Sequence, residues 1–203
     1  MARPQTIVLI PESTRKVRGS EGTGRIVNGF LDALPEPARG ALQALREEMF
    51  AKSAPGTVDR ATMRPAYRLF DGNMYRRIPQ EAWEERSPNV EVVIASGLYG
   101  LVTSRDTIAR YTHSMAGRMP PFGKLNRWWN GRGLPGILAA YLREVRAERV
   151  ADLLSLEYRE AVTGYADGVR GIDVETIDFP GMGRASQPRR GEKIAEILRT
   201  GEL

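Results

Sequence analysis

The sequence predicts an α/β fold: a single domain with a mainly parallel or mixed central sheet that is flanked by helices. Short, continuously apolar segments typical of buried strands alternate along the chain with longer segments of helical periodicity. The 203 residues suffice for one sizeable core, and 41% hydrophobic and 27% charged residues are ordinary values for a globular protein. We therefore expect residues 1–203 to form one domain.

Four apolar segments are the expected strands. The first, residues 6–10, is Thr-Ile-Val-Leu-Ile, and such an unbroken apolar run is typical of a strand in the middle of a parallel sheet. The others lie at residues 90–95, 150–154 and 174–179. Together they predict a sheet with the first strand near its centre.

Helices are expected between these strands. The clearest span about 35–52, 134–149 and 191–198, each with apolar residues at helical spacing, and a short one is expected at 79–86. Residues 57–78 suggest helical pieces that are interrupted at Pro65 and at the turn Asp71-Gly72-Asn73.

The segment after the strand at 90–95 has two interpretations. Ser96-Gly97-Leu98-Tyr99-Gly100 is followed by Ser104, Arg105, Asp106 and Tyr111, and ligands bind at the carboxyl ends of strands in open α/β sheets. Alternatively, the segment is a tight strand-to-helix connection in which Ser104 and Asp106 start the next helix.

Three of the predicted strands end in similar chemistry. Glu12 and Ser13 follow the first, Ser96 follows the second, and Ser155, Glu157 and Tyr158 follow the third. If these strands are neighbours, their polar ends meet at one edge and form a cleft suited to acid–base chemistry and anion binding. The alternative is that these residues are ordinary helix caps and first-turn acids.

Several classes of site are excluded or disfavoured. The chain has no cysteine, so disulfides, thiolate metal sites and cysteine nucleophiles are excluded. Gly19, Gly22 and Gly24 lack a P-loop ending, and the one histidine, His113, lies in no pattern of metal ligands. We therefore predict no metal and no cofactor.

Neither a membrane span nor a signal peptide is expected, because the apolar runs are too short. The cytoplasm is the default compartment, and the sequence leaves the oligomeric state open.

Basic residues gather in one part of the chain. The net charge is +5, and residues 104–132 hold six basic residues against one acid, with Tyr111, Phe122, Trp128 and Trp129 among them. This composition suits phosphates and stacked bases, although the tryptophans are equally suited to a core. We expect a basic, aromatic-containing insertion around 112–133, followed by Leu134-Pro135-Gly136-Ile137, which weakly resembles a helix-hairpin-helix motif.

Several segments together resemble a known family. They are TIVLIPESTRK, RLFDGNMYRRI, VVIASGLYGLVTSRDTIARY, LNRWWNGRGLPGILAAYL and VADLLSLEYREAV. They are similar to motifs of the peroxide stress protein YaaA family, of which the chain is identified as a short and divergent member. Departures occur at Glu12-Ser13, at Ser104 and at Thr112, where the family has other residues.

The resemblance implies a cytosolic α/β protein of the peroxide stress response that binds DNA, without sequence preference, or another phosphate-bearing ligand through a basic cleft. The alternative is a metal-free lyase, hydrolase or transferase with a glutamate–tyrosine acid–base pair acting on a small polar or nucleobase-like metabolite. A third interpretation is a binding protein without catalysis.

Two sets of candidate site residues follow from the residues and the resemblance. The catalytic candidates are Glu12, Ser13, Ser96, Tyr99, Asp106, Tyr111, Glu157 and Tyr158. The candidates for binding a ligand or anion are Lys16, Arg68, Tyr75, Arg105, Trp129, Ser155 and Arg190.

Overall fold

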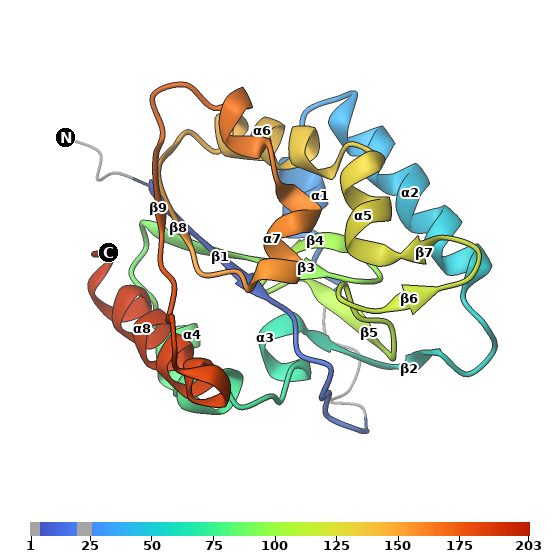
Figure 1. Ribbon diagram of the computed structural model, residues 1–203, viewed down its shortest axis with the longest axis horizontal. Helices are drawn as coiled ribbons and strands as arrows, with labels where there is room; N and C mark the ends of the chain where they lie inside the picture. The colour runs from blue at the N-terminus through green and yellow to red at the C-terminus, as the bar shows by residue number, and fades with distance from the viewer. Residues whose placement is uncertain (1–4, 20–25) are drawn as a thin grey trace.

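The computed structural model, which describes residues 5–19 and 26–203, is an α/β structure around a mixed five-stranded sheet (Figure 1). The strand order is β4-β3-β1-β8-β9. The bounds are β1 Gln5–Pro11, β3 Val90–Ser96, β4 Gly100–Thr103, β8 Ala147–Asp152 and β9 Asp173–Thr176. The predicted fold class and the central place of the first strand are confirmed.

The first, second and third predicted strands are parallel neighbours. β1 lies between β3 and β8, with Pro11 opposite Ala95 and Leu9 opposite Asp152. Residues 7–10 of β1 are at most 1% exposed, because both faces of the sheet are covered. The carboxyl ends of the three strands therefore meet at one edge.

Helices cover both faces of the sheet (Figure 1). On one side lie α1 Gly29–Ala33, α2 Ala38–Lys52, α5 Leu125–Gly131, α6 Leu134–Glu144 and α7 Leu156–Val162. On the other side lie α3 Ala66–Leu69, α4 Gln80–Glu84 and α8 Ser186–Thr200. Among the described residues, three short 3₁₀ turns are also present: η1 Tyr75–Arg77, η2 Tyr165–Gly168 and η3 Gly183–Ala185.

The interpretation of residues 96–106 as a strand-to-helix connection is wrong. The chain reverses into β4, which pairs antiparallel with β3, so that Ser96 lies opposite Gly100. Gly100 has a φ of 72°, and a Cβ there would lie 2.9 Å from the Trp129 ring, so only glycine suits this turn.

Residues 57–78 contain the expected helical pieces only in their second part, as α3 and η1. Their first part is strand β2 Val58–Pro65, which pairs antiparallel with β5 Thr107–Tyr111 in a separate two-stranded sheet. The expected helix at 134–149 ends at Glu144, because the chain needs Ala147 onward for β8. Residues 112–133 contain a small hairpin, β6 Arg118–Met119 with β7 Gly123–Lys124, followed by α5.

In the described part of the chain, no helix combines the length and the apolar character that a membrane span requires.

Candidate functional site

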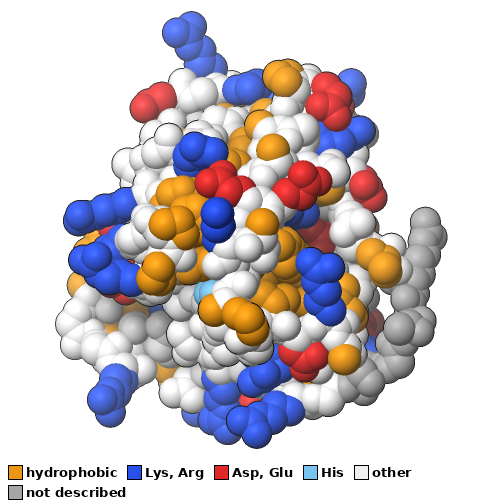
Figure 2. All heavy atoms as spheres, turned by 90° about the vertical axis from the view of Figure 1, so that its right-hand side faces the viewer, with side chains coloured by type: hydrophobic (Ala, Val, Ile, Leu, Met, Phe, Trp, Pro, Cys, Tyr) orange, Lys and Arg blue, Asp and Glu red, His pale blue; other side chains and the backbone are white. Residues whose placement is uncertain are grey.

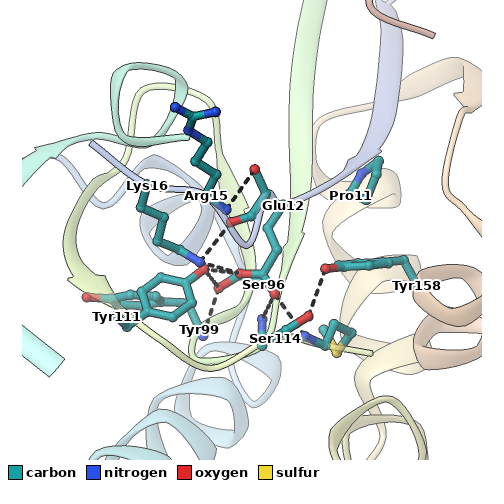
Figure 3. A network of polar contacts seen from close by, with 12 residues as sticks. Pro11, Glu12, Arg15, Lys16, Ser96, Tyr99, Tyr111, Ser114 and Tyr158 are labelled. Carbon is teal, nitrogen blue, oxygen red and sulfur yellow. Dashed lines mark hydrogen bonds and ion pairs between the residues drawn. The ribbon is translucent and has the colours of Figure 1, made fainter. Parts of the chain in front are cut away.

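The carboxylate of Glu12, directly after β1, is the centre of a buried polar network (Figure 3). Its Oε1 atom accepts the backbone N–H groups of Gly97 at 2.9 Å and Met115 at 2.8 Å. Its Oε2 atom accepts the Tyr111 hydroxyl and lies 3.7 Å from Nζ of Lys16. Four donors thus surround one carboxylate that is shielded from solvent.

The two backbone donors reach Glu12 because residue 97 is glycine. A Cβ at Gly97 would lie 2.6 Å from the carbonyl carbon of Ser114 and 2.7 Å from the nitrogen of Met115. Such distances are too short for a real Cβ, so the loop at Ser114 could not approach the β3–β4 turn as closely. The glycine therefore allows two separate loops to bind the same oxygen.

Lys16 is the cation of this network. It is 8% exposed, its Nζ donates to the Ser13 carbonyl at 2.8 Å, and it lies 4.0 Å from the centre of the Tyr111 ring. Burial lowers the pKa of Lys16, whereas the nearby Glu12 carboxylate opposes this shift.

Tyr111 links the carboxylate to the end of β3. Its hydroxyl lies 2.6 Å from Oγ of Ser96, which also accepts the backbone N–H of Tyr99 at 3.2 Å. Burial, reinforced by the Glu12 charge, raises the pKa of Tyr111 well above its usual value. The phenol therefore stays protonated and donates to Glu12.

These contacts give Glu12 a positioning role. Three donors hydrogen-bond the two oxygens of this carboxylate, and Lys16 adds an ion pair at 3.7 Å. Through these contacts the carboxylate holds together the end of β1, the β3–β4 turn and the Ser114 loop. The side chains left to meet a ligand lie beside it.

A cavity of about 350 Å³ lies next to the network, at the carboxyl edge of the sheet. Its lining comes from the end of β1 and the residues after it, from the 71–75 turn, from the start of α7 and from α8. The lining residues are Pro11, Glu12, Ser13, Thr14, Arg15, Gly72, Asn73, Met74, Tyr75, Ser155, Tyr158 and Gln187. This volume suits a small molecule.

Tyr158 faces both the cavity and the network (Figure 3). Its hydroxyl lies 3.1 Å from Oγ of Ser114, and burial together with the Glu12 charge raises its pKa. Tyr75 also lines the cavity, and its position is fixed because its hydroxyl donates to the Pro11 carbonyl at 2.9 Å. Burial raises the pKa of Tyr75. Both phenols are therefore protonated donors at neutral pH.

Eight of the fifteen candidate site residues belong to the network or the cavity. They are Glu12, Ser13, Lys16, Tyr75, Ser96, Tyr111, Ser155 and Tyr158. The sequence signal for Glu12, Ser13, Ser96, Ser155 and Tyr158 was their position after three strands that proved to be adjacent. Lys16, Tyr75 and Tyr111 lie in segments that resemble the family motifs.

Four other candidates hold structural contacts nearby. The Tyr99 hydroxyl accepts the backbone N–H of Ala109 at 2.9 Å. Asp106 accepts from Thr103 and from the backbone of Phe30, which fastens the β4–β5 turn to α1. Trp129 is fully buried and donates to the Gly97 carbonyl at 3.0 Å.

The fourth is Arg190, which is buried on α8, on the same helix as the cavity residue Gln187. The three remaining candidates lie outside the network. Glu157 points away, with a side chain that is 53% exposed and an ion pair to Lys124 at 3.8 Å. Arg68 and Arg105 both contact Glu84 or its backbone.

Sequence reasoning missed Ser114, Gln187 and the backbone N–H of Met115. The turn Asp71-Gly72-Asn73 was recognised, but nothing local indicated that Asn73 lines a cavity. Gln187 lies in the first turn of α8, where a polar residue carries no signal of its own. Among the residues that the structure describes, there is no group of three or more His, Cys, Asp or Glu side chains that could hold a metal ion.

Half of the basic residues at 104–132 are engaged with acids. The ion pairs are Lys124 with Glu157, Arg127 with Glu160 and Arg132 with Glu48. Figure 2, which faces the right-hand side of Figure 1, shows Lys and Arg side chains at several separate places with acidic and apolar groups among them.

Fold and site define a class of protein: an α/β protein with a polar, ligand-sized cavity at the carboxyl edge of a mixed sheet. The family model for peroxide stress protein YaaA matches residues 37–185. The chain belongs to this family, which confirms the resemblance of its motifs.

Relatives of modest similarity carry the name UPF0246 protein. One from Francisella tularensis subsp. tularensis (strain WY96-3418) is 26% identical over 138 residues, which are 64% of this chain and 54% of the relative. Another, from Ruegeria sp. (strain TM1040), is 30% identical over 105 residues, which are 49% of this chain and 41% of the relative. The chain thus spans about half the length of the curated relatives it matches.

Proposed function

We propose that this chain is a cytoplasmic, peroxide-stress-associated protein that binds a small polar metabolite in the cavity beside Glu12. One observation carries the proposal: Ser13, which follows β1, and Ser155 and Tyr158, at the start of α7 after the adjacent parallel strand β8, line one cavity of about 350 Å³. The family name of the matching model supports the link to peroxide stress.

The buried network beneath the cavity supports a role beyond packing. Removing Lys16 and Glu12 from water costs several kcal/mol per ion, of the order found for other buried charges, and only well-placed partners offset it. Ionisable groups with perturbed pKa values beside a cavity are typical of functional sites.

Tyr158 is a hydrogen-bond donor to the ligand in this proposal, because it lines the cavity and its raised pKa keeps the proton on the phenol. Glu12 and Lys16 hold Tyr111 and the surrounding loops in place.

Duplex DNA is the second candidate ligand. Arg118, in the β6–β7 hairpin, is exposed and forms no ion pair within the described part of the chain, and Leu134-Pro135-Gly136 starts α6 after a short turn from α5. Binding of this kind is dominated by phosphate contacts, so its affinity should fall steeply as salt rises. A flat salt response, or no binding at low salt, removes this candidate.

A ligand screen with two tyrosine variants tests the main proposal. Polar metabolites are screened by thermal shift, and the affinity of each ligand is then measured for the wild type, Tyr158→Phe and Tyr165→Phe. We expect Tyr158→Phe to weaken binding or turnover about tenfold, the effect of losing one hydrogen bond in a dry site.

Tyr165→Phe is the matched control, because its buried hydroxyl has no hydrogen-bond partner among the described residues and does not line the cavity. The proposal fails if no polar metabolite binds, or if both variants weaken binding equally.

A further inference from the structure

A second hollow adjoins the cavity of the proposed function. It has a volume of about 420 Å³, and its described lining residues are Asn73, Arg76, Arg77 and Pro188. Asn73 lines the cavity as well, and Gln187, another cavity residue, directly precedes Pro188 in the first turn of α8. The two spaces therefore meet at Asn73 and at the start of α8. We call the second space the arginine hollow.

Positive charge dominates this part of the molecule. Arg76 binds both carboxylate oxygens of Asp71, each at 2.8 Å, and Arg15, which lines the cavity, lies 3.3 Å from the same carboxylate. Arg77 is exposed and forms no ion pair within the described part of the chain. Two arginines thus compete for one carboxylate, and Arg77 has its guanidinium donors available for a ligand.

The turn that carries these arginines is held firmly against α8. A Cβ at Gly191 would lie 2.8 Å from Cβ of Arg77, so the glycine allows the η1 turn to pack closely on the helix. The two hydrogen bonds to Asp71 also orient Arg76. A site held in this way loses little conformational entropy when a ligand binds. Exposed arginines are common on protein surfaces, but these two line a hollow that adjoins a ligand-sized cavity.

We infer that the arginine hollow binds an oxyanion group, a phosphate or a carboxylate, of the ligand whose polar body occupies the cavity. Arg77 supplies the paired N–H donors, because planar guanidinium groups bind both oxyanions in this way. Asn73 contacts the ligand where the two spaces meet. This inference rests on the proposed function and adds the charge of the ligand.

The experiment uses two simple anions on the whole chain. Inorganic phosphate and malonate are titrated separately at constant ionic strength, with chloride as the balancing ion, and backbone amide signals are followed by NMR. We expect one or both anions to shift the amides of Asn73 and Arg77, and the tighter of the two indicates the oxyanion type.

Two exposed arginines provide the matched comparison. Arg77→Gln should weaken anion binding about tenfold, because a charge-assisted pair of hydrogen bonds is lost. Arg77→Lys, which keeps the charge but not the paired donors, should have an affinity between those of Arg77→Gln and the wild type. Arg189→Gln removes the same charge close to Pro188, but Arg189 lines neither space and pairs with Glu192, so its affinity should stay within about twofold.

Three results overturn the inference: neither anion shifts the amides of Asn73 and Arg77, Arg77→Gln binds as tightly as the wild type, or Arg189→Gln loses as much affinity as Arg77→Gln. Since Arg77 is exposed, its variants should fold. If Arg77→Gln does not fold, the amide map of the wild type and the affinity of Arg77→Lys decide the question.

Failure of the inference can be told from failure of the proposed function. An anionic metabolite from the screen should lose affinity in both Arg77→Gln and Tyr158→Phe, whereas inorganic phosphate, which has no polar body, should respond only to Arg77→Gln. Neutral metabolites that bind with sensitivity to Tyr158→Phe, while no anion binds, contradict only the inference. Anions that depend on Arg77, while Tyr158→Phe changes the affinity of no ligand, contradict only the proposed function.

Discussion

At the scale of single residues, the site depends on one carboxylate with four donors. Glu12 is bound by two backbone N–H groups, by Tyr111 and by Lys16. An ionised group in a dry interior needs such partners, because each unmet interaction costs free energy. Glu12, which the sequence suggests as an acid–base group, therefore has contacts typical of a residue that positions its neighbours.

Glu12→Gln should lower the free energy of unfolding by about 3–5 kcal/mol, because the amide leaves Lys16 as an uncompensated buried charge. The amide Nε2 would also direct its own donors at Tyr111 or at the backbone N–H groups. Urea unfolding of the purified variant, followed by circular dichroism, measures the loss.

Glu157→Gln is the control for this prediction. Its side chain is 53% exposed and its ion pair with Lys124 is long, so the loss should stay below about 1 kcal/mol. If the two variants lose the same free energy of unfolding, the buried Glu12 network stabilises the protein no more than an exposed ion pair does.

At the scale of elements, the β3–β4 turn and the Ser114 loop meet at Gly97. Both contribute an N–H group to Oε1 of Glu12, and this close approach depends on the missing Cβ. The turn is also fixed from the far side by Trp129, which donates to the Gly97 carbonyl. A substitution at Gly97 should therefore also move the Ser114 loop, which contacts the cavity residue Tyr158.

Gly97→Ala should destabilise the protein by about 1–3 kcal/mol, the usual cost of overpacking a filled interior. It should also weaken ligand binding, because the added Cβ pushes the Ser114 loop away from Tyr158. Thermal unfolding and ligand titration of the same preparation measure both effects.

Gly136→Ala is the matched change at an open position. Gly136 lies in α6, and a Cβ there would meet no atom within 4 Å. We expect a gain of about 0.5–1 kcal/mol from helix propensity and unchanged ligand binding. If Gly97→Ala also stabilised the protein and left ligand binding unchanged, the close packing of the Ser114 loop against Gly97 would be contradicted.

The elements also show how far sequence reasoning reaches. The strands at 6–10, 90–95 and 150–154 were predictable because each is a short apolar run buried on both faces. The hairpin of β3 and β4 was not predictable from the sequence. Gly97 and Gly100 are compatible with a turn that leads to a helix and equally with a turn that leads to a second strand.

The same limit applies to the candidate site. Glu12, Ser13, Ser155 and Tyr158 follow strands, so they could be grouped before the structure was known. The roles of Ser114, Met115 and Gln187 depend on how distant loops pack, which no local pattern encodes. Asp106 and Trp129 were both candidate site residues. In the structure Asp106 stabilises the β4–β5 turn through Thr103, and Trp129 packs in the core.

At the scale of the whole molecule, the parallel order of β3, β1 and β8 creates the site, because it brings three polar strand ends to one edge. Burial at this edge also makes the stability depend on pH. Tyr75, Tyr111 and Tyr158 all have raised pKa values in the folded state, whereas the pKa of Lys16 is lowered.

We predict that the free energy of unfolding falls as pH rises above about 10. A tyrosine with a raised folded pKa binds its proton longer in the folded state, so its contribution is complete below 10.0 and is lost above it. Lys16 acts in the opposite direction, but only below 10.5, where its unfolded form still holds a proton.

Measurements above pH 10.5 therefore exclude the contribution of Lys16 to the slope. Each should contribute a slope of about 1.4 kcal/mol per pH unit, so Tyr111→Phe should make the slope shallower by that amount. Urea midpoints at a series of alkaline pH values give both slopes. If the free energy of unfolding falls with pH equally steeply in the wild type and in Tyr111→Phe, the claim that Tyr111 is a buried phenol with a raised pKa is contradicted.

The measurement that tests the central claim most directly is a crystal structure of the protein with the tightest ligand from the metabolite screen. We predict electron density for that ligand in the cavity, in contact with Ser13, Ser155 and Tyr158. Density for the ligand on another surface, with the cavity side chains unchanged, would contradict a binding site at the carboxyl edge of the sheet.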